Sequence, residues 1–143
     1  MSESESNAQV KPRAIVAGHG EFAAGLVSAV QQITGRGNIF RTISARDLSA
    51  ADLEGLLRRS IEETGVTVVF TDLQAGSCTM ATRRYLKNRS DVLLVAGVNL
   101  PMLVRAFTYR MRGMDTLIKK AVSGGCEGVL QFETASPYAP ARS

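Results

Sequence analysis

The stretch AIVAGHGEFAAGL, residues 14–26, runs from a short apolar segment through a glycine-flanked histidine into a helical pattern. Residues 14–17 are apolar on both faces, as the buried strands of parallel sheets are. Four apolar side chains then recur at the spacing of one helix face: Phe22, Leu26, Val30 and Ile33. Gly35 follows them as a helix C-terminal signal. A strand that turns directly into a helix is the repeating unit of α/β domains.

The same alternation continues along the chain. Further strands are predicted at residues 38–43, 66–71 and 91–96, and the last two are apolar on both faces. Helices are predicted from the Ser49 cap to Gly65, from Thr79 to Lys87, from Pro101 over PMLVRAFTYRM, and from Asp115 to Ser123. The fold class is therefore α/β: an open, mainly parallel sheet of four parallel strands, with helices on both faces.

The end of the chain predicts one more strand. Gly124 and Gly125 permit an abrupt exit from the last predicted helix, and CEGVLQF, residues 126–132, follows them. Its apolar side chains need a sheet edge, so residues 127–132 are expected to form a C-terminal antiparallel strand. The edge that it joins belongs either to the same chain or to a neighbouring copy.

The composition fits one intracellular domain. A chain of 143 residues can bury a core without a metal or disulfide staple. The domain is expected at residues 13–133, between a disordered N-terminal tail of residues 1–12 and a C-terminal tail of residues 134–143. Two cysteines and one histidine lack the spacing and number for a zinc site, so no metal or cofactor is expected. No stretch reads as a secretory signal or membrane span, which predicts a cytoplasmic location.

The net charge of +4 raises the question of nucleic-acid binding. Thirteen of the seventeen basic residues are arginine, but they are scattered from Arg13 to Arg142. No basic run exceeds a pair, and no aromatic stacking residues are interleaved with them. The sequence therefore argues against a nucleic-acid partner.

Polar side chains follow three of the predicted strands, where a parallel sheet gathers its ligands. His19 follows the first strand, Asp72 and Ser77 follow the third, and Asn99 follows the fourth. Each has a simpler role open to it: His19 as a turn residue, Asp72 or Ser77 as a helix cap, and Asn99 as a turn former. Their common position at strand carboxyl ends favours one functional site.

Several enzyme classes do not fit these residues. His19 lacks the preceding arginine of histidine phosphatases, and the glycine spacing after Gly18 fails the dinucleotide pattern. The chain has no phosphate-binding P-loop motif, and no G-x-S-x-G elbow surrounds Ser77.

The interpretation that remains is that His19 itself carries a phosphoryl group. A neutral imidazole attacks phosphorus with one ring nitrogen while the other donates its proton to a carboxylate, for which Asp72 is placed. The phosphoryl group would then lie among helix N-terminal amides and the Ser77 hydroxyl. Gly18, Gly20 and Gly76 would keep side chains out of its way.

At this point the chain resembles a known family, the mannose-type enzyme IIA domain of the bacterial sugar phosphotransferase system. The resemblance rests on VAGHGEFAAGL, VVFTDLQAGSCTMA and LLVAGVNLPMLV, and more loosely on CEGVLQF, in order and at family-like intervals. The sequence departs from the family in one loop. Residues 75–80 read AGSCTM where Gly-Gly-Ser-Pro, an aromatic residue and asparagine are typical.

The resemblance implies a function and its partners. Nε2 of His19 would accept a phosphoryl group from HPr. His19 would then pass it to a IIB component that works with membrane IIC and IID components. Asp72 would orient the ring, Gly20, Gly76 and Ser77 would bind phosphate, and Asn99 would support the site. The family's usual dimer, in which the last strand crosses to the partner, implies a homodimer that exchanges residues 127–132.

Two other functions stay open. A regulatory module of an incomplete phosphotransferase system would use the same histidine as a switch that controls another protein. A small hydrolase would use Ser77 as its nucleophile.

Overall fold

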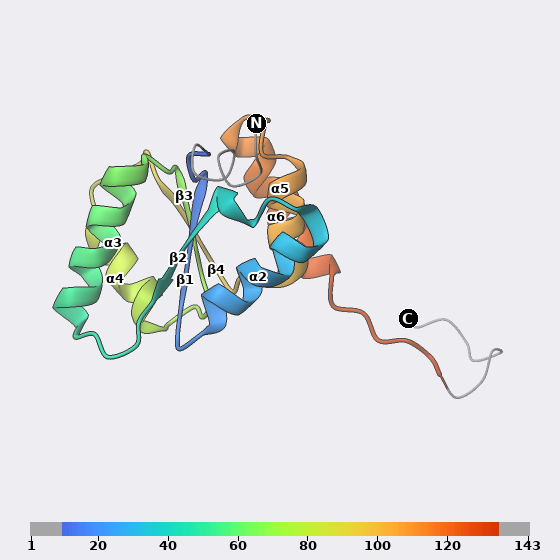
Figure 1. The fold of residues 1–143 in the computed structure, drawn as a ribbon, viewed down its shortest axis with the longest axis horizontal. Helices are drawn as coiled ribbons and strands as arrows, with labels where there is room; N and C mark the ends of the chain where they lie inside the picture. Colours follow the sequence, from blue (N-terminus) through green and yellow to red (C-terminus); the bar gives the residue numbers. More distant parts are fainter. Residues whose placement is uncertain (1–9, 135–143) are drawn as a thin grey trace.

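The computed structural model describes residues 10–134 and contains a four-stranded, fully parallel sheet (Figure 1). Its strands are β1 (Ala14–Gly18), β2 (Phe40–Ser44), β3 (Val68–Thr71) and β4 (Leu93–Ala96). They lie in the order β2-β1-β3-β4, so that β1 pairs with both β2 and β3. The predicted α/β class and its four parallel strands are confirmed.

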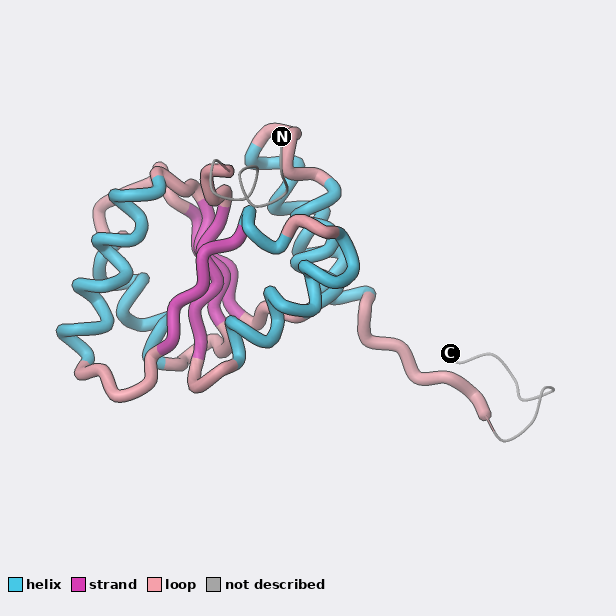
Figure 2. Tube along the Cα trace, in the orientation of Figure 1, coloured by secondary structure: helices cyan, strands magenta, loops and turns pink. Residues whose placement is uncertain are grey.

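Helices cover both faces of the sheet (Figure 2). They are α2 (Phe22–Thr34), the short 3-10 helix η1 (Gly37–Ile39), α3 (Ala50–Thr64), α4 (Ser77–Tyr85), α5 (Leu100–Thr108) and α6 (Met114–Glu127). Helices α3 and α4 pack on one face, whereas α2, α5 and α6 pack on the other. Within residues 10–134, no helix has the length and apolar character needed to cross a bilayer.

Strand β1 supplies both halves of the core because its side chains alternate between the two faces. Ile15 and Ala17 pack with Leu57 of α3, whereas Val16 packs in the cluster that includes Val30 of α2 and Leu103 of α5. All of these side chains are buried. A strand that is apolar throughout therefore lies at the centre of the sheet, as the sequence predicts.

The helix signals near the start of the chain are confirmed. The Ser49 hydroxyl caps α3 by accepting a hydrogen bond from the Asp52 amide at 3.1 Å. Gly35 and Gly65 end α2 and α3 in the left-handed conformation, with φ of 75° and 67°. The loops of this α/β unit are thus fixed locally by its sequence.

The predicted C-terminal strand is not confirmed, and the predicted end of the last helix is wrong. Helix α6 continues through Gly124 and Gly125 to Glu127, so Cys126 and Glu127 are helical. Residues 129–134 have no regular secondary structure, and the sheet formed by the described residues has four strands. The predicted tails, residues 1–12 and 134–143, fall mostly outside the described range.

Close packing explains why α6 does not stop at the two glycines. A Cβ atom on Gly124 would lie 2.3 Å from Cγ of Arg105, and one on Gly125 would lie 2.7 Å from Cε of Met102. Both glycines are buried against α5. They are contact points between two helices rather than a helix end.

Two smaller expectations are also corrected. Helix α4 begins at Ser77, two residues before the predicted start. Strand β4 is only partly buried, with Leu93 exposed, although its sequence is apolar on both faces. It lies at the edge of the sheet, where one side of the strand has no neighbouring strand within residues 10–134.

Candidate active site

The candidate site lies at the carboxyl ends of β1 and β3, the two central strands. These strands pair in register, with Ala17 opposite Thr71. The helix that follows β1 packs on one face of the sheet, whereas the helix that follows β3 packs on the other. Diverging connections of this kind open a crevice at the carboxyl edge, the usual place for a ligand in such sheets. His19 and Asp72 are the first residues beyond the two strands.

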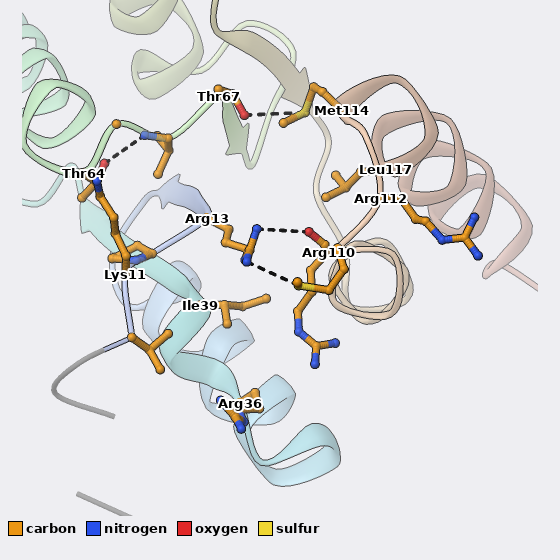
Figure 3. A pocket seen from close by; sticks show the side chains of 15 residues that line it. Lys11, Arg13, Arg36, Ile39, Thr64, Thr67, Arg110, Arg112, Met114 and Leu117 are labelled. Atoms are coloured by element: carbon orange, nitrogen blue, oxygen red, sulfur yellow. Dashed lines mark hydrogen bonds between the residues drawn. The ribbon is translucent and has the colours of Figure 1, made fainter. Parts of the chain in front are cut away.

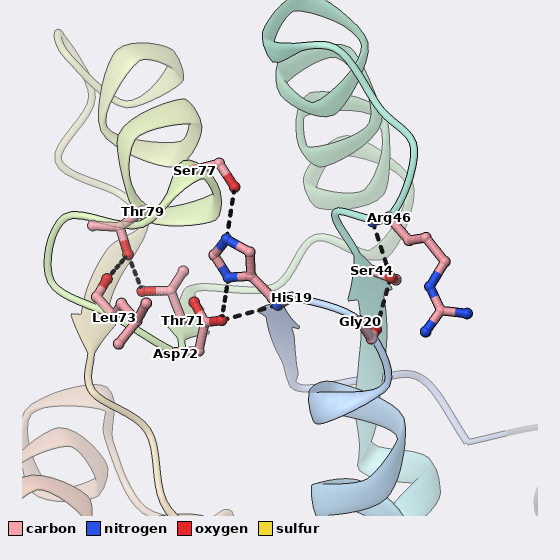
Figure 4. Close-up of polar contacts among 9 residues, drawn as sticks. All are labelled: His19, Gly20, Ser44, Arg46, Thr71, Asp72, Leu73, Ser77 and Thr79. Carbon is pink, nitrogen blue, oxygen red and sulfur yellow. Dashed lines mark hydrogen bonds and ion pairs between the residues drawn. The ribbon is translucent and has the colours of Figure 1, made fainter.

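The Asp72 carboxylate holds the His19 ring. Oδ2 of Asp72 lies 2.7 Å from Nδ1 of the ring and also accepts a hydrogen bond from the His19 backbone amide at 2.9 Å (Figure 4). The Asp72 side chain is 9% exposed and the His19 side chain 55%. The orienting group is therefore sheltered, while the ring that it orients faces solvent.

The charge of Asp72 determines which ring nitrogen is available. Burial raises the pKa of Asp72, but the hydrogen bonds from the His19 ring and backbone outweigh it and leave the pKa below its usual value. The carboxylate is thus ionised at neutral pH and can only accept hydrogen bonds. In the neutral ring the proton must therefore lie on Nδ1, so that Nε2 keeps its lone pair.

Nε2 faces the amino terminus of α4. Oγ of Ser77, the first residue of that helix, lies 3.5 Å from Nε2, which is long for a hydrogen bond (Figure 4). The first amides of a helix have no partner within the helix, and the helix dipole favours an anion there. An anionic group on Nε2 would thus be placed near amides and a hydroxyl that can stabilise it.

At two positions, glycine is required because neighbouring side chains lie too close to leave room for a Cβ atom. A Cβ atom on Gly76 would lie 3.3 Å from Cε1 of His19, and one on Gly18 would lie 3.1 Å from Oδ2 of Asp72. Gly20 serves a different purpose, because its φ of 52° is a left-handed conformation that side chains disfavour. The glycines named from the sequence therefore shape the histidine loop and the space between the ring and the amino terminus of α4.

Two buried threonines, which the sequence did not assign to the site, fix the loop that carries Asp72. The Thr79 hydroxyl donates to the Leu73 carbonyl and lies 2.6 Å from the Thr71 hydroxyl. Since the only proton of the Thr79 hydroxyl goes to that carbonyl, Thr71 must be the donor in the second bond. A threonine at the end of a fully buried strand was the signal that could have revealed this support.

Ser44 supports the opposite loop. Its hydroxyl donates to the Gly20 carbonyl at 2.8 Å and accepts from the Arg46 amide at 3.1 Å (Figure 4). Ser44 thus fastens the end of β2 to the turn that follows His19, a role that the sequence did not predict.

A family comparison bears on this geometry. The family model EIIA-man, described as the PTS system fructose IIA component, matches residues 13–122. The chain belongs to this family. It is thus a phosphotransferase-system IIA component, and its candidate site consists of a histidine, a carboxylate and a helix amino terminus. No match was found among curated protein sequences.

Solved structures of similar proteins agree with the family. Phosphotransferase system component EIIA from Streptococcus agalactiae superposes with a TM-score of 0.75 at 25% identity, over 83% of this chain and 95% of that one. A putative phosphoenolpyruvate-dependent sugar phosphotransferase permease from Klebsiella pneumoniae gives 0.74 at 27%, over 85% and 90%. The mannose/sorbose-specific IIA subunit from Enterococcus faecalis, at 23% identity, shares the fold with a TM-score of 0.75, over 89% and 98%.

Asn99 holds the scaffold of this IIA component together. Its Oδ1 accepts from the Met102 amide at 3.1 Å and so caps α5, and its Nδ2 donates to the Gly125 carbonyl of α6 at 3.2 Å. These bonds tie the loop after β4 to two helices. The structure therefore brings His19, Asp72, Gly76 and Ser77 together, whereas the amide of Asn99 is used in helix contacts.

The departures from the family loop leave this geometry intact. Gly20, Gly35, Gly65 and Gly97 account for the glycines with positive φ among the described residues, and the one other residue with positive φ is Asp47, so Ala75 has no strained backbone. Cys78 is fully buried in the core cluster beneath α4. Burial and the nearby Asp72 charge raise the pKa of its thiol to about 11, so Cys78 is a packing residue.

Proposed function

We propose that this IIA component is a phosphocarrier that accepts a phosphoryl group from HPr on Nε2 of His19 and passes it to a IIB component. The observation that supports this most directly is the 2.7 Å contact between Nδ1 of His19 and Oδ2 of Asp72. It leaves the other ring nitrogen as the nucleophile, beside the amino terminus of α4.

The transfer step follows from the protonation state of the ring. The Nε2 lone pair forms a bond to phosphorus, and the bond from phosphorus to the donor breaks, with its electron pair leaving on the donor. The Nδ1 proton stays in its hydrogen bond to Asp72, whose negative charge stabilises the positive ring. Glycine at positions 20 and 76 leaves space for the phosphoryl oxygens, which the Ser77 hydroxyl and helix amides would bind.

The partners and location belong to the same proposal. HPr and IIB would approach the open carboxyl edge of the sheet, where the His19 side chain is 55% exposed. The IIB component would connect the protein to membrane IIC and IID components, while the IIA domain, residues 13–133, works in the cytoplasm.

The dimer is proposed from the segment after α6. Val129, Leu130 and Phe132 are 83%, 67% and 72% exposed, and β4 offers a sheet edge. A homodimer that exchanges this segment would cover both features. The full chain with Val129→Lys and Phe132→Lys should be monomeric by light scattering, while Met111→Lys, at another exposed apolar position, should remain a dimer. A dimer that survives the double change would place the interface elsewhere.

Incubation with phosphoenolpyruvate, enzyme I and HPr tests the proposed carrier. The wild-type protein should gain one acid-labile, alkali-stable phosphate and lose it when a cognate IIB component is added. His19→Ala should gain none. A protein that is phosphorylated on His19 but gives no phosphate to any IIB component would instead be the regulatory switch. Neighbouring genes for HPr and a kinase, without IIB, IIC and IID genes, would agree with that role.

A hydrolase is the second candidate, because Ser77, His19 and Asp72 lie in the order of a catalytic triad. The Ser77 to Nε2 distance of 3.5 Å is long for proton transfer in this state. A fluorophosphonate probe should leave Ser77 unlabelled if the protein is a carrier, whereas stoichiometric labelling would support the hydrolase.

A further inference from the structure

A second concave site lies at the amino ends of the strands, whereas His19 lies at their carboxyl ends. It is a cavity of about 600 Å³ formed by the segment before β1, the ends of α2 and α3, and the turn between α5 and α6 (Figure 3). Strand β1 separates the two sites: Arg13, in the cavity lining, precedes the strand, and His19 follows it. Five strand residues span roughly 17 Å, so one small ligand cannot occupy both sites.

The cavity is strongly cationic. Five of its fifteen lining residues are basic, and none is acidic: the cations are Lys11, Arg13, Arg36, Arg110 and Arg112. Within residues 10–134, none of the five forms a salt bridge, although three arginines elsewhere do. A concentration of positive charge inside a concavity attracts anions more strongly than the same charge spread over a surface.

Two of the arginines are held in place by backbone groups. The Arg13 guanidinium donates to the Arg110 carbonyl at 3.3 Å and contacts the Met111 sulfur at 3.4 Å (Figure 3). The Arg110 guanidinium donates to the Phe107 carbonyl at 3.0 Å and stacks on the Phe107 ring at 4.0 Å from its centroid. Each guanidinium has five N–H groups, so these bonds orient it without using up its donors.

Helix dipoles offset only part of this positive charge. The carboxyl ends of α2, α3 and α5 lie at this edge, and each carries about half a negative charge. Together they amount to about −1.5 charges, against five cations in the lining. The remaining positive charge is enough for two or more phosphate groups.

The rest of the lining is apolar enough for a ring. Ile39, Val66, Met114 and Leu117 contribute to one continuous cavity with the cations. The volume lies within the range of sites that enclose a drug-sized molecule and exceeds what phosphate groups alone would fill. We propose that this cavity binds a nucleoside diphosphate or triphosphate, with its phosphates on the arginines and its ring on the apolar side.

Calorimetric titration of the full chain with ADP and with GDP tests this inference. The double variant Lys11→Gln/Arg13→Gln should bind about tenfold more weakly or worse. The charge-matched control Arg58→Gln/Arg59→Gln, on exposed positions of α3, should bind like the wild type. Equal weakening in both double variants would show a non-specific response to net charge and overturn the site, as would no binding of either nucleotide.

A second variant guards against loss of folding. Thr67 is exposed and lines the cavity, so Thr67→Glu adds a negative charge with little loss of packing. It should abolish nucleotide binding while the urea midpoint stays close to that of the wild type. Retained binding in this variant would contradict the inference.

Further ligands separate the two parts of the proposal. Inorganic pyrophosphate should bind more weakly than ADP, and adenosine should not bind detectably. Pyrophosphate that binds as tightly as ADP would overturn the role of the apolar lining. His19→Ala should bind ADP like the wild type, so failure of the phosphocarrier proposal would leave this result unchanged.

Discussion

One carboxylate oxygen of Asp72 accepts two hydrogen bonds from His19, one from the ring at 2.7 Å and one from the backbone at 2.9 Å. The loop after β3 therefore fixes both the position and the tautomer of a ring that follows β1. Because both loops start from adjacent central strands, the sheet itself sets the distance between the two residues.

Asp72→Asn tests this coupling. The amide can present an N–H to Nδ1 and so favour the wrong tautomer, which should slow phosphoryl transfer by about 10² to 10⁴. The far-UV spectrum and thermal midpoint should remain close to those of the wild type. Rapid-quench measurement of transfer from HPr gives the rate. Unchanged kinetics would leave Asp72 with a purely structural role.

Gly76→Ala should disturb the ring. The new Cβ would lie 3.3 Å from Cε1 of His19 and 3.2 Å from Cβ of Leu73, so the ring must shift to make room. Transfer should slow by about tenfold or more, because reaction rates fall steeply with small misplacements.

The control for this glycine is Gly25→Ala on α2, where an added Cβ meets nothing within 4 Å. It should keep the wild-type transfer rate and gain about 0.5–1 kcal/mol in the free energy of unfolding. If Gly76→Ala also transferred phosphate at the wild-type rate, the close approach of residue 76 to the His19 ring would not matter for transfer.

Thr79→Val should weaken the loop that carries Asp72. It removes the hydroxyl that joins Thr71 to the Leu73 carbonyl, which should lower the free energy of unfolding by about 1–3 kcal/mol and slow transfer. Thr82→Val removes a hydroxyl that bonds only within α4, to the Cys78 carbonyl at 2.7 Å. Urea unfolding and transfer kinetics of both variants decide the matter: equal slowing would mean that the loop network is irrelevant to the site.

The two cysteines should react differently with iodoacetamide at pH 8. Cys78 is buried with a thiol pKa raised to about 11, so it remains protonated, whereas Cys126 is exposed. Mass spectrometry should find one label per native chain, on Cys126, and two labels in urea. Rapid labelling of Cys78 in the native protein would show that the region beneath α4 opens readily.

The sequence predicted the centre of the fold and the proximity of His19 and Asp72 for a common reason. Residues 14–17 and 66–71 are apolar on both faces because the central strands are buried between two helix layers, and that pattern is local. The polar residues directly after them then occupy the carboxyl edge by topology. His19 and Asp72 could therefore be paired although 53 positions separate them.

The sequence-based predictions fail where a residue is chosen for a contact with a distant part of the chain rather than for its local conformation. A glycine pair commonly ends a helix, but Gly124 and Gly125 allow α6 to approach α5, a contact that no local pattern shows. The helical spacing of Ala121, Gly125 and Gly128 was the available sign of a small-residue face. The supporting role assigned to Asn99 from its position at the edge stays a prediction, and the Asn-Leu-Pro sequence also fits the cap of α5 that the structure shows.

The identity of the phosphorylated nitrogen tests the central claim most directly. The ionised Asp72 holds the proton on Nδ1, so the phosphoryl group should form its bond to Nε2 of His19. The protein, ¹⁵N-labelled in its histidine ring and phosphorylated through enzyme I and HPr, should show phosphorus coupling to Nε2 by NMR. Coupling to Nδ1, or phosphate that persists in His19→Ala, would contradict the account.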